Sequence, residues 1–252
     1  MDFISARIRW AYYLLAIAAA QPAMSAAPPA AEASTKADNH RSHAVDFDAA
    51  SLREGKFTYR LSIKDEVLGL AIIEVRHAGK DLYKVTFDSK DVGQRWTSSF
   101  GSRLEPIAAT LDIADEQSPY SMSLRYSGTG VSGTQSAKGA AKPIAAVFDR
   151  QVIDQRVDWA AMMAARIPHA KNVEFAVYEP NTGLSRLVGS STESQPIGGV
   201  LGNVPTIKLD YTIHKDHGAE SYSVYATKAE PRIMLREDMP GELVSVLVAV
   251  ED

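Results

Sequence analysis

Apolar and polar residues alternate with a period of two along most of the chain, which is the pattern of half-buried β-strands. In "FTYRLSI", residues 57–63, every second residue is apolar, and "LYKVTFD", residues 82–88, repeats this alternation. The segment "LGLAIIEVRHAGKD" between them reads as a strand that ends in a turn at Gly79. We therefore predict a three-stranded meander over residues 56–89.

Strand patterns continue on both sides of the middle of the chain. Further segments with this pattern are "QRWTSSF", "LEPIAATLDIA", "YSMSLRYSG", "VEFAVYEP", "TIKLDYTIH", "ESYSVYATKA" and "PRIMLREDMPGELVSVLVAV". The stretch "GTGVSGTQSAKGAAKP", residues 128–143, is rich in glycine and could be compared with a phosphate-binding loop. It leads through Pro143 into an apolar strand and not into a helix, so we predict a hairpin loop.

One segment, "VDWAAMMAARIP", has high helix propensity. Asp154 or Asp158 can cap the start of this helix, and Pro168 prevents its continuation. Its bulky residues follow the spacing i, i+3, i+4 of a buried helical stripe. We predict a mainly β fold, in which a curved antiparallel sheet or incomplete β-barrel surrounds one short central helix over residues 157–167.

The first residues have the three-part layout of a secretory signal peptide. Two arginines precede the apolar run "WAYYLLAIAAA" and the small residues "AMSAA", which predicts a signal peptide over residues 1–25. A run of this length is too short for a permanent membrane span. Residues 26–44 are mostly alanine, proline and polar residues, typical of a disordered leader, and residues 45–252 are expected to form a single β-rich domain.

The amino-acid composition limits the cellular compartments and the partners that we expect for the protein. The chain has no cysteine, which excludes disulfides, thiolate metal sites and a cysteine nucleophile. Together with the signal peptide this predicts a periplasmic protein. The formal net charge is −4 and no basic cluster occurs, so nucleic acid is not an expected partner.

Residues suited to catalysis or metal binding occur only in weak patterns. His214 and His217 in "HKDH" could bind a metal with Asp210 or Asp216, but no helix and no third firmly placed ligand support this, so we predict a solvated hairpin turn. The acidic residues at 112, 115 and 116 lack the glycine-centred spacing of a calcium loop. Neither serine-nucleophile pattern, Gly-x-Ser-x-Gly or Ser-x-x-Lys, occurs. We therefore assign no catalytic residue, no metal ligand and no cofactor.

Aromatic and methionine residues are the remaining candidates for a ligand-binding site. They can fill a solid core or line an apolar cavity, and the sequence leaves both possibilities open. If a cavity exists, the residues expected to contact an apolar ligand are Trp159, Met162, Met163, Tyr59, Phe87 and Tyr211.

The order of these segments resembles a known family. The fragments "SSFGSRLEP" and "VDWAAMMAARIP" and the closing run from "YTIHKDHG" to "VLVAV" resemble a family of exported bacterial β-rich proteins of unknown function. That family is similar in layout to periplasmic carriers that shuttle lipoproteins in an incomplete barrel closed by helices. The resemblance implies a curved sheet divided by one helix, and it implies no catalytic residues.

Three functions follow as hypotheses. The first is a periplasmic, non-enzymatic protein that binds an apolar envelope molecule, such as a lipid, or an envelope partner protein. The second is an envelope hydrolase acting on a cell-wall or polysaccharide substrate through surface carboxylates with His214 or His217. The third is a structural component of an envelope complex that makes contact through an exposed edge strand.

Overall fold

The computed structural model describes residues 45–167 and 171–251. The signal peptide and leader expected over residues 1–44 lie outside these ranges, as do His40, His43 and His169. The described residues from Val45 onward belong to one compact unit. In this described part, none of the helices is both long enough and apolar enough to span a membrane.

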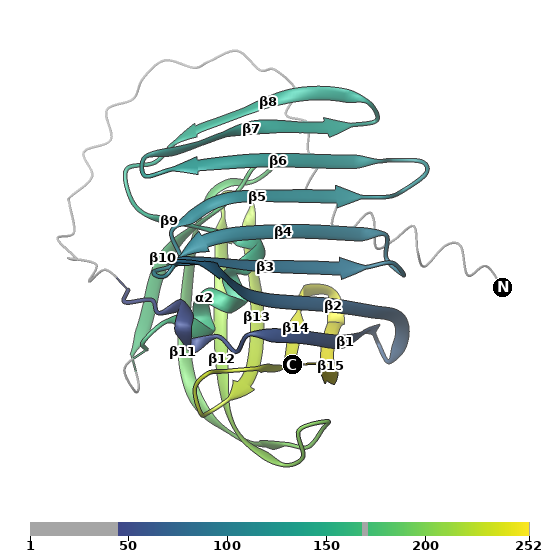
Figure 1. Cartoon of the computed structure of the whole chain (residues 1–252), viewed down its shortest axis with the longest axis vertical. Helices are drawn as coiled ribbons and strands as arrows, with labels where there is room; N and C mark the ends of the chain where they lie inside the picture. The colour runs from purple at the N-terminus through teal and green to yellow at the C-terminus, as the bar shows by residue number, and fades with distance from the viewer. Residues whose placement is uncertain (1–44, 168–170, 252) are drawn as a thin grey trace. The chain divides into compact units, whose positions relative to one another are not determined.

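One open sheet of 15 strands makes up most of the fold (Figure 1). Its neighbouring strands pair in the order β8-β7-β6-β5-β4-β3-β2-β1-β15-β14-β13-β12-β11-β10-β9, and all pairs are antiparallel except β9 with β10. The strands are β1 (Gly55–Ile63), β2 (Glu66–Gly79), β3 (Leu82–Ser89), β4 (Gln94–Gly101), β5 (Pro106–Ile113), β6 (Tyr120–Ser127), β7 (Gly130–Ala137), β8 (Ala140–Val147), β9 (Val152–Asp154), β10 (Asn172–Glu179), β11 (Gly183–Ile197), β12 (Val204–Lys215), β13 (Gly218–Thr227), β14 (Met234–Met239) and β15 (Leu243–Glu251).

These observations confirm the mainly β prediction, with a curved antiparallel sheet around one short helix, and also the meander over residues 56–89. The sheet does not close into a barrel, because its two outermost strands, β8 and β9, do not pair with each other. The prediction of a loop over residues 128–143 is wrong. This segment forms β7 and the first half of β8, joined at Lys138 and Gly139, which both have positive φ as a tight hairpin turn requires.

Both ends of the sheet are poorly suited to pairing with another chain. Strand β9 has only three residues, all buried. In β8, the Phe148 N–H just beyond the strand donates to Thr129 on the β7 side at 2.9 Å. Since N–H groups alternate between the two sides of an antiparallel strand, Pro143 lies where the N–H would face the free edge. Proline there leaves the β7–β8 ladder intact and removes a donor from the exposed edge.

Helix α2 (Asp158–Ala164) follows a short 3₁₀ turn, η2 (Gln155–Val157). Asp154 caps η2 by accepting a hydrogen bond from the Arg156 N–H. The predicted end near residue 167 is wrong, because Ala165 adopts an extended conformation and pairs with Phe47. The segment over residues 45–54 before β1, here called the strap, includes the 3₁₀ turn η1 (Ala49–Ser51). Its backbone forms hydrogen bonds with the backbone groups at the end of α2 that would otherwise have continued the helix.

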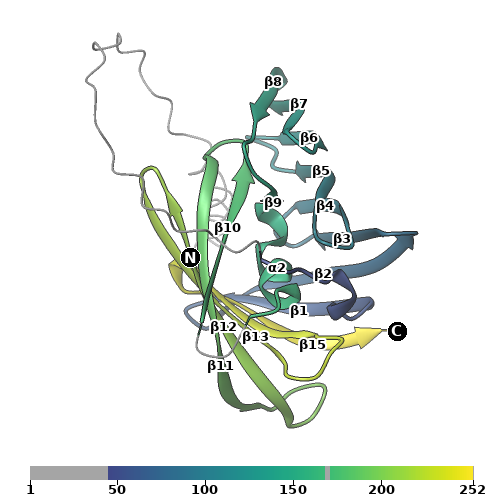
Figure 2. The same ribbon diagram turned by 90° about the vertical axis from the view of Figure 1, so that its left-hand side faces the viewer.

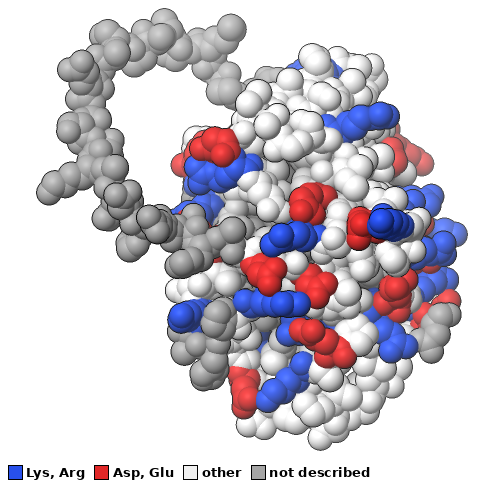
Figure 3. Space-filling model, turned by 60° about the vertical axis from the view of Figure 1, so that its left-hand side comes forward, with Lys and Arg blue, Asp and Glu red and all other residues white. Residues whose placement is uncertain are grey.

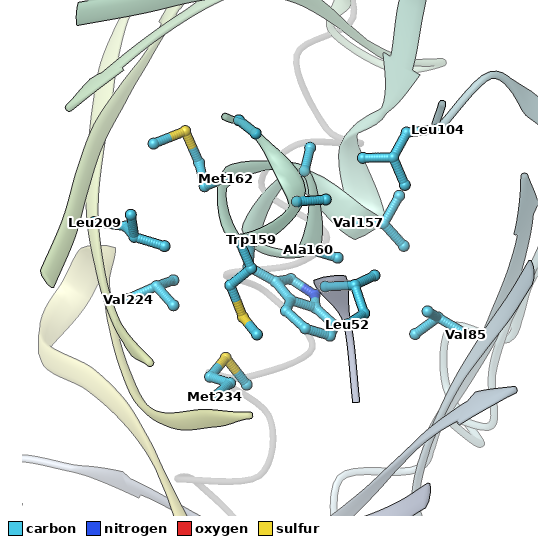
Figure 4. Packing of buried hydrophobic residues seen from close by; sticks show 14 of the residues in the cluster. Leu52, Val85, Leu104, Val157, Trp159, Ala160, Met162, Leu209, Val224 and Met234 are labelled. Carbon is cyan, nitrogen blue, oxygen red and sulfur yellow. The ribbon is translucent and has the colours of Figure 1, made fainter. Parts of the chain in front are cut away.

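The sheet bends so that its two arms enclose α2. Figure 2 shows the arm from β1 to β8 on one side, the arm from β10 to β13 on the other, and α2 between them. All seven residues of α2 are buried. Figure 4 shows the packing around the helix, where Trp159 lies near Leu52 and Met234 and Met162 points toward the side of Leu209. The interior around α2 is therefore filled by the protein's own side chains.

A second apolar cluster joins the far ends of the two arms. Phe148 and Tyr126 both pack edge-on against Tyr178 of β10, with ring centroids 5.0 and 6.4 Å apart. Next to them, the buried carboxylate of Asp154 binds the Arg156 guanidinium at 2.6 Å. Side chains therefore hold β9 and β10 against β5 to β8 at the place where no backbone ladder closes the sheet.

Candidate functional site

A small apolar pocket lies between α2 and the strands β1, β2 and β14. It is lined by the apolar residues Leu52, Phe57, Tyr59, Ile73, Val75, Trp159, Met163, Ile233 and Met234, together with Arg53 and Arg232. Its free volume is about 10 Å³, which is room for about one water molecule. A larger apolar molecule therefore enters only if side chains move.

Arg232 connects this pocket to the end of the helix. Its guanidinium donates to the Met163 carbonyl in the last turn of α2 and pairs with Glu230 at 2.8 Å. The buried Nε has no hydrogen-bond partner. Burial lowers the pKa of Arg232, because the nearby Glu230 only partly compensates the lost hydration of its charge. An incompletely compensated cation thus lies at the edge of an apolar pocket.

The structure brings together three of the six residues expected to contact a ligand: Trp159, Met163 and Tyr59 all line this pocket. Met162 is fully buried on the other side of the helix, facing β11 at Gly189. Phe87 is partly buried and stacks on Trp96 with ring centroids 5.5 Å apart. These two residues belong to the core packing around the helix and do not line the pocket.

The sixth expected residue, Tyr211, belongs to a buried acidic site behind the pocket. Its hydroxyl donates to Asp158 at 3.2 Å, and Asp158 also accepts a hydrogen bond from the Trp159 N–H at 2.6 Å. Glu237 of β14 is buried at the same site. The two carboxyl groups come from the first turn of α2 and from the sheet that faces it.

Burial shifts the titration of both carboxyl groups. Loss of hydration, more than any other cause, raises the pKa of Asp158 to about 7, while its hydrogen bonds act in the opposite direction. The same cause raises the pKa of Glu237 to about 8, and the charge of Asp158 adds to this shift. Near neutral pH the pair therefore retains protons that isolated carboxyl groups would have lost.

Sequence reasoning missed this pair. Residues 236–239 belong to strand β14, and the turn begins only at Pro240. Glu237 has the same phase along the strand as Leu235, and the burial of that residue could have indicated an inward position. Asp158 was considered only as a helix cap.

The residues of the hydrolase hypothesis lie apart from this site. His214 is exposed near the end of β12, and His217 is exposed in the turn that follows. Of the acidic trio, Asp115 accepts hydrogen bonds from the N–H groups of Gln117 and Ser118, as in a simple turn. Within residues 45–167 and 171–251, no cluster of three or more potential metal ligands is found.

A second hollow of about 450 Å³ lies over strands β11 to β14 and is lined mainly by polar residues. Its carboxylate Asp210 is bound by Lys208 at 2.7 Å and accepts a hydrogen bond from Ser223. Asp238 pairs with Arg236 at 2.6 Å. On the face shown in Figure 3, Lys and Arg are likewise interspersed with Asp and Glu. The charged groups of this hollow are thus largely paired with one another.

No family model, no curated protein and no solved structure matches the chain. The resemblance drawn from the segment order therefore stays a prediction.

Proposed function

We propose that the protein is an exported, non-enzymatic binding protein, and that it holds an apolar envelope molecule with an acidic end in the pocket beside Trp159. The observation that carries the proposal is the lining of this pocket, which combines aromatic rings and methionines with the incompletely compensated Arg232. Sites for small ligands typically combine an apolar lining with a few polar groups in this way.

The pocket has to widen before a ligand enters. Met163 and Met234 form two of its walls, and methionine side chains change conformation at low cost because they are unbranched. Residues 51–53 of the strap cover the pocket. They are held to Arg232 by backbone hydrogen bonds of one isolated bridge and not by a continuous ladder. These features support a pocket that is nearly closed without ligand and opens around an acyl chain.

Arg232 supports an acidic end group over a neutral one. Its Nε is a free buried donor, and its pairing with Glu230 leaves the cost of burial incompletely offset. A ligand carboxylate or phosphate beside this guanidinium would add a charge-assisted hydrogen bond, which is stronger than a hydrogen bond between neutral groups. We therefore expect a fatty acid to bind more tightly than the alcohol of the same chain length.

Native mass spectrometry tests the proposal on protein exported to the periplasm and purified without detergent. The expected result is a stoichiometric apolar adduct that organic extraction removes. Titration of the extracted protein with palmitate and with hexadecanol then measures the preference for an acidic end. Arg232→Gln should weaken palmitate binding about tenfold or more, whereas Arg236→Gln on the outer face should leave it unchanged. Absence of both the adduct and palmitate binding would contradict the proposal.

The geometry gives less support to the other two hypotheses. A hydrolase built on His214 and His217 would rely on exposed residues at a strand end and a turn. A structural component that pairs through an edge strand would meet Pro143 on β8 or the three buried residues of β9.

A further inference from the structure

The buried carboxyl groups of Asp158 and Glu237 have no part in the binding contacts described above. We propose that they form a proton-controlled latch, which holds α2 against the sheet while the pair is protonated and loosens the helix when both groups ionise. Opening of the latch would widen the pocket beside Trp159. This last step rests on the proposed function, whereas the latch itself does not.

The position of the pair supports this role. Asp158 belongs to the helix and Glu237 to β14, so their interaction crosses the boundary between the helix and the sheet. Tyr211 of β12 donates its hydroxyl to Asp158 at 3.2 Å, and the same phenol lies near Glu237 and lowers the pKa of that group. Two negative charges at this site would repel each other across the helix–sheet boundary.

The surrounding groups offer little positive charge. The titratable and charged groups that face the pair are Asp154 before the helix, Tyr211 and Lys215 of β12, Glu220 and Tyr222 of β13, Asp238 of β14 and Tyr59 of β1. Lys215 is the cation among them, and it is already bound to Glu220 at 2.6 Å. Glu220 in turn accepts the Tyr222 hydroxyl at 2.9 Å. Ionisation of both members of the pair would therefore place uncompensated charge in the interior.

This charge would act on two walls of the pocket. Asp158 accepts the N–H of Trp159, whose ring lines the pocket from the helix side. The charge of Glu237 reaches Tyr59, which lines the opposite wall and donates to the Met234 carbonyl at 2.9 Å. Trp159 and Tyr59 therefore connect the acidic pair to the pocket.

The direction of the pH effect follows from the raised pKa values. The folded protein holds protons at Asp158 and Glu237 that the unfolded chain releases at lower pH. The folded state binds more protons in this window, so its stability falls as pH rises from about 4 to about 8. The latch is closed at mildly acidic pH and loosened at mildly alkaline pH.

Hydrogen–deuterium exchange of the full chain tests the latch. After correction for intrinsic exchange rates, opening of the segment over residues 155–165 should increase on the order of tenfold or more between about pH 5.5 and about pH 8.5. The segment over residues 120–127 in β6 is the internal reference and should change little. The double variant Asp158→Asn, Glu237→Gln should lose the pH dependence, whereas Asp210→Asn on the outer face should keep it.

Two further outcomes are informative. If the double variant does not fold, Glu237→Gln alone keeps the bond from Tyr211 to Asp158 and should reduce the pH dependence of the helix segment without abolishing it. An identical pH response in the wild type and the Glu237 variant would overturn the latch. If helix opening follows pH but palmitate binds at neither pH, the latch stands and the proposed ligand is wrong.

Discussion

Gly189 of β11 lies directly against Met162 of α2. A Cβ atom at position 189 would be 2.4 Å from the Met162 Cε and 3.0 Å from the Tyr211 Cβ. Met162 has no exposed surface, so its side chain has no solvent-filled space to move into. The absence of a side chain at residue 189 therefore allows the helix to approach the sheet this closely.

Replacement of Gly189 by alanine should destabilise the protein by about 1–3 kcal/mol, because the added methyl group overpacks a filled core. Chemical denaturation measures the change in the free energy of unfolding. Gly198→Ala is the matched control, since a Cβ there meets no atom within 4 Å. Equal stability of the two variants would show that the helix can move away from β11 without cost.

Trp159→Ala should be among the most damaging substitutions on the helix. The indole is 6% exposed and packs beside Leu52 and Met234, so its removal should cost roughly 3–5 kcal/mol. Val147→Ala is the control, since Val147 is 88% exposed and should change the stability by less than about 0.5 kcal/mol. A loss below about 1 kcal/mol for Trp159→Ala would contradict the packing described here.

For the buried ion pair of Asp154 and Arg156, we expect loss of one partner to be more destabilising than loss of both. Arg156→Met leaves a buried carboxylate without its partner and should cost about 3–5 kcal/mol. The double variant Asp154→Leu, Arg156→Met should recover part of this loss, because both buried charges are then absent, although the cap of η2 is lost. Thermal unfolding of the two variants provides the comparison, and a double variant less stable than Arg156→Met would argue against charge burial as the cause.

Pro143 should protect the free edge of β8 from pairing with other chains. Pro143→Val restores an outward N–H on a strand that already has Val147 exposed, so we expect concentration-dependent self-association in sedimentation velocity experiments. Ala145→Thr alters the same strand but keeps the proline and should remain as monodisperse as the wild type. Monodisperse behaviour of Pro143→Val would leave the proline without this role.

Local patterns predicted the strands wherever large apolar residues alternate with polar ones. Over residues 56–89 the alternation and the turn at Gly79 were sufficient. Over residues 130–147 the inward positions include glycine and alanine as well as larger residues, so the same period was obscured and we predicted a loop over residues 128–143. The strands there are specified by the hairpin pairing of β7 with both β6 and β8, and by a tight turn at Lys138 and Gly139.

The site was less predictable than the fold for a physical reason. The bulky stripe on the helix identified Trp159 and Met163, because helical spacing is a local property. The meeting of Asp158 with Glu237 depends on how the C-terminal arm folds back over the helix, and no local pattern encodes that. The end of α2 was misplaced for the same reason, since Ala165 leaves the helix to pair with Phe47, more than a hundred residues earlier in the chain.

The pairing of β1 with β15 places the first and last strands side by side in the middle of the sheet. During synthesis, one side of β1 therefore remains unpaired until residues 243–251 arrive. Contacts between such distant segments form slowly, because a long loop must close first. A chain arranged in this way cannot complete its continuous sheet before β15 has emerged, because β15 is the strand that joins β1 to β14.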